Sequence, residues 1–229
     1  MKVSMIRSIL AVILGTAALF SSGPAMAQAF SSLVDITAVD QEIVQERDGK
    51  MTKGAPQRFG QGIILDSNGV IATNKHVVGD KPERIYVLLS DGGKFEAKIV
   101  RVNETDLALI KINSYSPSLR SIAMADSSQV EIGNPVLAVA KSSLTAKQKH
   151  SGEIVQVYRE AATDKVAILE VNIPLKPGDS GGPILNEQGL LLGLIMANQA
   201  NDQNRSYAIA ADEIRQEYLK YKNSTLISG

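Results

Sequence analysis

The stretch QGIILDSNGVIATNKHVV, residues 61–78, has the pattern that decides the fold. Two short apolar runs rich in β-branched residues flank a DSNG segment at 66–69, which is the composition of a turn between antiparallel strands. The second run ends at NKHVVG, which predicts at most a single helical turn. The stretch therefore predicts a β-hairpin followed directly by a histidine, His76.

The same design recurs on both sides of this hairpin. Further alternating or apolar runs are LVDITAV, RIYVLLSDGGKFEAKIVRV, DLALIKI, NPVLAVA, GEIVQVY, VAILEVN, GGPILN and GLLLGLIMA. The Ser- and Pro-containing segment 114–121 reads as a connector between two groups of these strands. Many short strands at close spacing predict antiparallel sandwiches or barrels and not βαβ units. The chain has 229 residues, which suffices for one sizeable domain or two small ones that share an interface.

Two other segments of the mature chain differ from this strand pattern. ADEIRQEYLKYK, residues 211–222, predicts a helix with Ile214, Tyr218 and Leu219 on one face. RDGKMTKGAPQR, residues 47–58, is polar and contains Gly and Pro, so we expect a mobile loop there.

The N-terminus has the composition of a secretory signal peptide. Lys2 and Arg7 precede an apolar run at 9–20, and the segment closes on the small-x-small triplet that ends at Ala27. We expect residues 1–27 to be a signal peptide cleaved after Ala27, with the periplasm or the medium as destination. The alternative is a retained membrane anchor, which would need about 20 apolar residues, more than this run has. The absence of Cys from the chain predicts an exported protein without disulfides.

Charge and ligand-type residues exclude several classes of function. Lys and Arg together number 24, as do Asp and Glu, so no basic excess favours nucleic acid or an anionic membrane. With no Cys, two scattered His and no phosphate-binding loop, we expect no metal and no cofactor.

Three residues could form a nucleophilic site. His76 follows an apolar strand, Asp106 opens another, and Ser180 lies in the turn PGDSGGPIL at 177–185. A serine hydroxyl needs a neutral imidazole as base, and a carboxylate that receives the imidazole N–H fixes its tautomer. Each residue alone also fits a bland interpretation as a turn, surface or strand-end residue. The second histidine, His150, lies in the charged segment KQKHSGE, for which we expect solvent exposure.

The glycines around Ser180 suit this chemistry. The backbone N–H groups of Gly178 and Ser180 could point together at a developing oxyanion. Gly181 and Gly182 let the chain leave the turn sharply, without the clash that a Cβ would cause.

Five segments in order, ATNKHVV, SDGGKFEAKIV, TDLALIKI, PGDSGGPIL and RSYAIAADEIRQEY, resemble the trypsin-like serine proteases of the HtrA/DegP type. The resemblance covers residues 59–222. It implies an all-β fold of two six-stranded antiparallel β-barrels with a C-terminal helix, residues 28–118 forming the first barrel and 119–229 the second. It also implies a His76–Asp106–Ser180 triad between the barrels, an oxyanion loop of Gly178, Asp179 and Ser180, and polypeptide substrates.

The chain departs from this family in three places. HtrA proteases usually have Asn where this chain has Asp179. The glycine-rich loop of the family is replaced by KSSLTAKQKHSGE, residues 141–153, which puts the ordering of the active site in question. The sequence ends soon after the predicted C-terminal helix, and we expect no PDZ domain.

The resemblance also indicates a primary specificity pocket. Its walls would include Ile195, Met196 and Ala208, which are apolar and predict a preference for small or medium aliphatic side chains. Two functions remain open: an exported serine endopeptidase, or a proteolytically silent binding or scaffold protein with the same fold. Many relatives assemble through N-terminal segments, so a homo-oligomer is also open, and a membrane is a partner only if the signal segment is retained.

Overall fold

The computed structural model describes residues 23–41, 43–47, 50–112, 119–143, 146–199 and 202–227. The strands are β1 (Leu33–Val39), β2 (Ile43–Arg47), β3 (Lys50–Gly54), β4 (Gln57–Ile64), β5 (Val70–Asn74), β6 (Arg84–Leu88), β7 (Lys94–Val102), β8 (Leu107–Ile112), β9 (Pro135–Ser143), β10 (Ala146–Arg159), β11 (Val166–Val171), β12 (Pro183–Leu185), β13 (Leu191–Gln199) and β14 (Asp202–Ala210). The helices are α1 (Pro24–Ser32), the single turn α2 (Lys75–Val78), the 3₁₀ turn η2 (Ser127–Gln129) and α3 (Ala211–Ile227).

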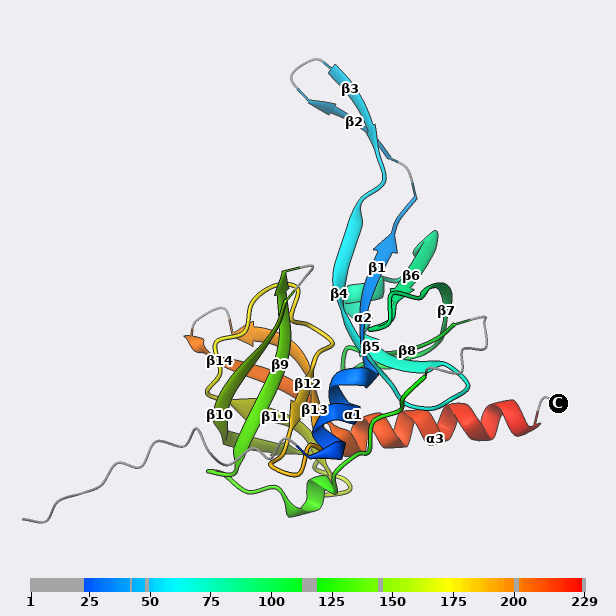
Figure 1. The fold of residues 1–229 in the computed structure, drawn as a ribbon. Helices are drawn as coiled ribbons and strands as arrows, with labels where there is room; N and C mark the ends of the chain where they lie inside the picture. The colour runs from blue at the N-terminus through cyan, green and yellow to red at the C-terminus, as the bar shows by residue number, and fades with distance from the viewer. Residues whose placement is uncertain are drawn as a thin grey trace, which may run out of the picture.

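Twelve of these strands close into two barrels, which stand side by side in Figure 1. The first has the order β1-β4-β5-β8-β7-β6 and the second β10-β11-β14-β13-β12-β9, with antiparallel neighbours throughout. The C-terminal helix α3 follows the last strand. The predicted all-β fold of two six-stranded antiparallel barrels with a C-terminal helix is therefore confirmed.

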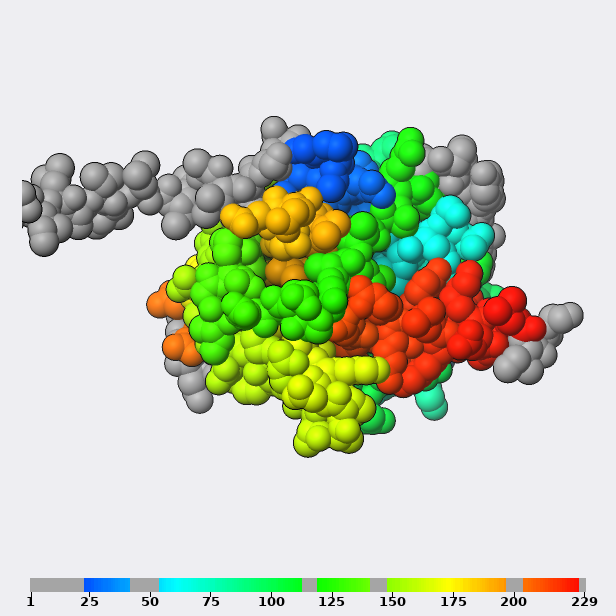
Figure 2. Space-filling model, turned by 90° about the horizontal axis from the view of Figure 1, so that it is seen from below, coloured from blue at the N-terminus to red at the C-terminus, as the bar shows by residue number. Residues whose placement is uncertain are grey.

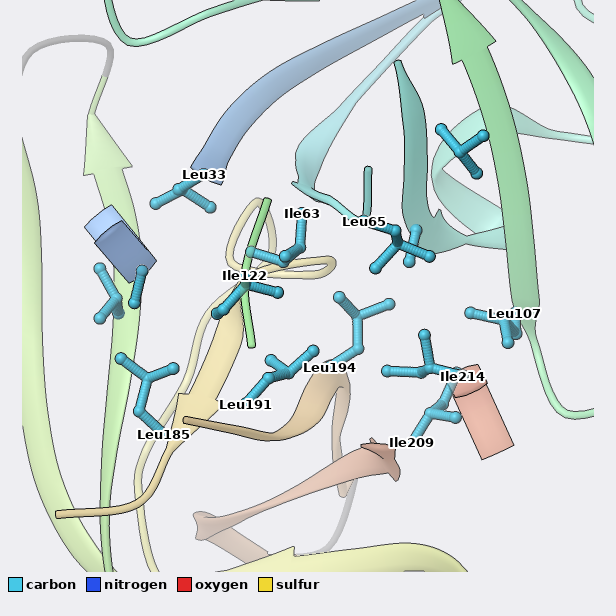
Figure 3. Packing of buried hydrophobic residues seen from close by; sticks show 14 of the residues in the cluster. Leu33, Ile63, Leu65, Leu107, Ile122, Leu185, Leu191, Leu194, Ile209 and Ile214 are labelled. Atoms are coloured by element: carbon cyan, nitrogen blue, oxygen red, sulfur yellow. The ribbon is translucent and has the colours of Figure 1, made fainter. Parts of the chain in front are cut away.

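Several strands are buried on both faces, which explains why they read as continuous apolar runs and not as alternating ones. In β8, Ala108 and Ile110 face the interior of the first barrel, whereas Leu107 and Leu109 belong to a separate cluster between the barrels. Figure 3 shows this cluster, in which side chains from β4 and β8 meet others from β12, β13 and β14. The two barrels thus share one apolar interface in addition to their own cores.

Two segments that we expected to be loops are largely strands. Residues 47–58 contribute to the hairpin β2–β3, which projects from the first barrel in Figure 1, and to the start of β4. Residues 141–153 lie mostly in β9 and β10, with only 144–145 outside the described residues. Both segments are rich in polar residues, so they lack the apolar alternation that would have predicted strands.

Helix α1 spans the expected signal cleavage point after Ala27, whereas residues 1–22 lie outside the described part. Met26 is only 5% exposed and packs in the cluster between the barrels. The Met26 backbone lies so close to Gly189 that a Cβ added to Gly189 would come within 2.7 Å of the Met26 backbone nitrogen. No helix among the described residues is long and apolar enough to cross a membrane.

Helix α3 starts below the second barrel and runs beneath the first, as Figures 1 and 2 show. Ile214 is fully buried as expected, but Leu219 is 51% exposed and does not share its face. The Tyr218 hydroxyl donates a hydrogen bond of 2.7 Å to Asp66 in the β4–β5 turn. Burial and this carboxylate raise the pKa of Tyr218 above its ordinary value. The helix therefore ties the two barrels together from below.

Candidate active site

His76 lies in the single turn α2, directly after β5. The two residues that follow it, Val77 and Val78, are buried and anchor the turn to the first barrel. The His76 side chain is 47% exposed, so its ring can be reached from solvent. This combination of a buried anchor and an open ring suits a base that must meet a substrate.

Asp106 holds the histidine through two contacts. One carboxylate oxygen accepts the backbone N–H of His76 at 2.9 Å, and the other lies 2.7 Å from its Nδ1. The carbonyl of Asp106 also accepts the backbone N–H of Lys75 at 2.7 Å. Occupation of Nδ1 leaves Nε2 as the ring nitrogen that is available for proton transfer. Asp106 has a φ of 67°, a left-handed conformation that is unusual for a residue with a side chain.

Ser180 lies at the start of a tight turn between two glycines with positive φ. Gly178 has a φ of 98° and Gly181 of 87°. The Ser180 hydroxyl donates a hydrogen bond of 3.1 Å to the carbonyl oxygen of Met196 on β13. No hydrogen bond joins Ser180 to His76 in the described part of the chain, so the resting hydroxyl has an acceptor other than the imidazole.

The backbone N–H groups of this turn differ in their hydrogen bonding. Among the described residues, neither the N–H of Gly178 nor that of Ser180 donates a hydrogen bond. The N–H of Asp179, by contrast, is taken by the carbonyl of Lys176 at 3.0 Å. Of the three residues expected in the oxyanion loop, two therefore have an available donor.

Asp179, between Gly178 and Ser180 in this turn, is only 3% exposed. One carboxylate oxygen accepts the backbone N–H of Lys176 at 2.7 Å, and the other has no hydrogen-bond partner among the described residues. Burial raises the pKa of the Asp179 carboxyl, although the Lys176 N–H and the charges of His150 and Lys176 act in the opposite direction. A buried carboxylate with one unpaired oxygen is destabilised in its charged form.

His150 differs from its expected place. It lies within β10 opposite Ala138 and is partly buried, not exposed in a turn. Among the described residues His150 has no hydrogen bond to the triad, and its charge acts to lower the pKa of Asp179.

The three expected pocket residues do not share one environment. Ile195 and Ala208 pair across β13 and β14 and are 1% and 0% exposed, in the core of the second barrel. Met196 is partly exposed, and its carbonyl lies beside the Ser180 hydroxyl. Met196 is therefore the one of these three residues that has appreciable solvent exposure.

One acidic residue lies beside this wall. Glu170 on β11 pairs with Tyr207, next to Ala208, and is 4% exposed. Its oxygens accept hydrogen bonds from Arg205 at 2.9 Å and from the Tyr158 hydroxyl at 2.8 Å. The bond to Glu170 raises the pKa of Tyr158 to about 12. The charge of Glu170 is therefore already compensated.

Sequence reasoning missed one residue next to the nucleophile turn. Gln61 on β4 is 1% exposed and donates its backbone N–H to the Ser180 carbonyl at 2.7 Å. Its side-chain Nε2 lies 3.3 Å from the Gly178 carbonyl, to which it donates. The sequence signal for Gln61 was a polar residue between two glycines, directly before an apolar run. The first of these glycines, Gly60, leaves no room for a Cβ beside Val77.

Comparison with known families gives a match to the trypsin-like peptidase domain over residues 60–194, a range that contains His76, Asp106 and Ser180. HhoA of Synechocystis, named as a serine protease, is 32% identical over 162 residues, which cover 68% of this chain and 41% of the relative. A protein of Pseudomonas putida, named as a DegP-like periplasmic serine endoprotease, is 32% identical over 68% of this chain and 33% of its own. An HtrA-like serine protease of Staphylococcus aureus is 26% identical over 83% of this chain.

Each of these relatives is much longer than the matched region, and the chain spans less than half of their length. Among solved structures, the HtrA-type protease AlgW with a decapeptide superposes with a TM-score of 0.72 at 20% identity, over 86% of this chain and 66% of the other. The same protease with a tripeptide gives a TM-score of 0.67 at 21% identity, over 84% and 60% of the two chains. At this level of identity the structural likeness concerns the fold.

Proposed function

Since the chain belongs to the family of trypsin-like peptidase domains, we propose that it is a serine endopeptidase that hydrolyses polypeptides through an acyl-enzyme formed on Ser180. The observation that carries this proposal is the double contact between His76 and Asp106, together with the free N–H groups of Gly178 and Ser180. These are the base, its orienting carboxylate and the oxyanion donors that acyl transfer requires.

In the proposed reaction, the Ser180 hydroxyl turns from the Met196 carbonyl toward Nε2 of His76 and gives up its proton as it attacks the peptide carbonyl. The developing oxyanion accepts hydrogen bonds from the N–H groups of Gly178 and Ser180. Asp106 stabilises the imidazolium without taking the proton itself. His76 then protonates the leaving amine, and water enters by the same acid–base route to release the acyl group from Ser180.

The proposed specificity is for small or medium aliphatic side chains at the cleavage site. It is supported by the apolar Met196 beside the nucleophile and by the compensated charge of Glu170, which leaves this carboxylate poorly suited to attract a basic side chain. Mass spectrometry of a digested peptide library would measure it. Cuts after aliphatic residues are expected, and a digest dominated by cuts after Lys or Arg would contradict the proposal.

A second candidate is a proteolytically silent binding or scaffold protein, which the hydrogen bond from Ser180 to Met196 favours. A fluorophosphonate label distinguishes the two, because only an activated serine reacts with it. We expect the wild type to be labelled, and Ser180→Ala and His76→Ala to lose labelling. Turnover should fall on the order of a million-fold in either variant, the loss seen in subtilisin.

His150→Ala is the matched control, because it removes the only other histidine of the chain, which has no hydrogen bond to the triad among the described residues. It should be labelled nearly as fast as the wild type. A folded wild-type sample that takes up no label would establish the silent alternative.

We also propose export to the periplasm or the medium, which the N-terminal composition and the name of the Pseudomonas relative support. Cleavage after Ala27 would remove Met26 from the cluster between the barrels and start the mature chain inside α1. The mass of the mature protein tests this: a chain that starts at Gln28 supports the proposed cleavage, and any other start contradicts it.

A further inference from the structure

We infer that Glu213, in the first turn of α3, is a positioning residue that orients Asp106 through the turn between β7 and β8. This inference rests on the proposed function, since it concerns the same triad. It goes beyond that function because Glu213 belongs to the C-terminal helix of the second barrel, whereas Asp106 and His76 belong to the first.

The turn that carries Asp106 needs support. It has only four residues, 103–106, between two long strands, and Asp106 must adopt its left-handed φ of 67° within it. Residues in such conformations persist only where their surroundings over-determine them. The carboxylate would otherwise be free to leave the position in which both oxygens meet His76.

Asn103 provides the first layer of this support. Its Oδ1 accepts the backbone N–H groups of Thr105 at 3.1 Å and Leu107 at 3.0 Å, on either side of Asp106. Its own N–H donates to the Leu107 carbonyl at 3.0 Å. The Asn103 amide thus closes a ring of hydrogen bonds around the residue that contacts the base.

Glu213 sets the orientation of that amide. Its Oε1 accepts Nδ2 of Asn103 at 2.7 Å and lies 3.2 Å from the Thr105 hydroxyl. A carboxylate can only accept, so it draws the NH₂ end of Asn103 toward itself and turns the oxygen toward the backbone of the turn. Its negative charge also suits the N-terminal end of α3.

The contacts form a continuous path from the second barrel to the base. Helix α3 begins directly after β14, which pairs with β13, the strand whose Met196 carbonyl accepts the Ser180 hydroxyl. At its other end the path passes from Glu213 through Asn103 to Asp106 and His76. Glu213 therefore couples the acid–base pair to the barrel that supplies the nucleophile.

The same helix offers a matched control one turn later. Glu217 is buried, whereas Glu213 is only partly so, and like Glu213 it binds the first barrel, through Arg101 on β7, while Lys220 donates to its other oxygen at 2.6 Å. Burial opposes its ionisation, but the hydrogen bonds from Lys220 and Arg101 prevail and hold the pKa of Glu217 below its ordinary value. Among the described residues, the polar partners of Glu217 are Arg101 and Lys220 and none of residues 103–106, so Glu217→Ala tests helix docking without removing a hydrogen bond from that turn.

The experiment compares the rate of fluorophosphonate labelling of wild type, Glu213→Ala, Glu213→Gln and Glu217→Ala, each corrected for the folded fraction. In Glu213→Ala we expect the rate to fall about ten- to a hundredfold, the scale of a small misplacement in an active site. Glu213→Gln keeps an acceptor for the Asn103 amide and should restore most of the rate, while Glu217→Ala should keep the wild-type rate.

If Glu213→Ala does not fold, Asn103→Ser takes its place, since the hydroxyl still supports the turn but cannot bridge to Glu213. The inference is overturned if the wild type is labelled but the variant keeps the wild-type rate, or if Glu217→Ala loses as much of the rate as Glu213→Ala does. A wild type without label would overturn the proposed function itself, and the positioning role with it.

Discussion

The backbone N–H of Gln61 donates a hydrogen bond of 2.7 Å to the carbonyl oxygen of Ser180. Gln61 belongs to the first barrel and Ser180 to the second, so the nucleophile turn is held from across the interface between them. The Gln61 side chain adds a second bond at 3.3 Å, to the Gly178 carbonyl. The shape of this turn is therefore a property of the docked pair of barrels and not of the second barrel alone.

This close approach makes Gly181 irreplaceable. A Cβ at Gly181 would come within 1.8 Å of the Gln61 carbonyl oxygen, and its φ is 87°. We expect Gly181→Ala to lower the free energy of unfolding by at least about 3 kcal/mol, from overpacking and backbone strain together. Urea denaturation measures this. Gly133→Ala is the control, since it has a φ of 88° with nothing near the added Cβ, and should cost only about 1 kcal/mol. Equal losses in both variants would contradict the role of Gln61.

The Gln61 side chain itself should matter for labelling more than for stability. Its Oε1 is buried without a partner among the described residues, so Gln61→Met removes one unsatisfied atom together with one hydrogen bond. We expect a change in unfolding free energy within about 1 kcal/mol and a fluorophosphonate labelling rate about tenfold lower, since the Gly178 carbonyl loses its donor. Gln188→Met, in an exposed turn, should change neither quantity. If Gln61→Met is labelled at the wild-type rate, the Gln61 side chain has no role in activating the serine.

Asp106→Asn should separate chemistry from folding. Asparagine also tolerates the left-handed conformation, so we expect the melting temperature to change little. Turnover should fall on the order of 10⁴-fold, as the equivalent change does in trypsin, because the amide no longer selects the required tautomer. Asp164→Asn is the matched control, as Asp164 has a φ of 57° and lies in the exposed β10–β11 turn. If the Asp106→Asn variant keeps its turnover, the prediction is wrong and a group other than Asp106 orients His76.

The buried Asp179 should make stability depend on pH. Its pKa is raised by burial, so the folded state holds the proton more tightly than the unfolded state does. Stability is then fully present below the ordinary value of about 3.9 and is lost as pH rises through the raised pKa. Asp179→Asn removes this loss, so we expect a gain in melting temperature at pH 7 that shrinks toward pH 4.

Asp126→Asn provides a control of opposite sign. Hydrogen bonds from Ser128 lower the pKa of Asp126, so its contribution to stability is present above its ordinary pKa and lost on acidification. That substitution should therefore lower the melting temperature at pH 7, and this effect should persist down to about pH 4 and fade only below it. A gain from Asp179→Asn that is the same at both pH values would contradict the assignment.

Much of the fold follows from local patterns. The apolar run of β8 and the turn composition at 66–69 each predict their element, because strand alternation and turn residues act over a few neighbours. The periodicity of 211–222 likewise predicts α3, although not that Leu219 would be exposed. The hairpin β2–β3 escaped prediction because its sequence is mostly polar and lacks the apolar alternation that predicts a strand.

The sequence by itself determined the residue types that the proposed chemistry needs, His76, Asp106 and Ser180, and the glycine turn around the serine. Only the tertiary structure decided how they are held: Gln61 on the Ser180 carbonyl, and Glu213 on Asn103 from 110 residues away. The reason is physical. Turn composition and periodicity act between near neighbours, whereas these hydrogen bonds exist only once two closed barrels and the final helix have docked and brought distant polar groups together.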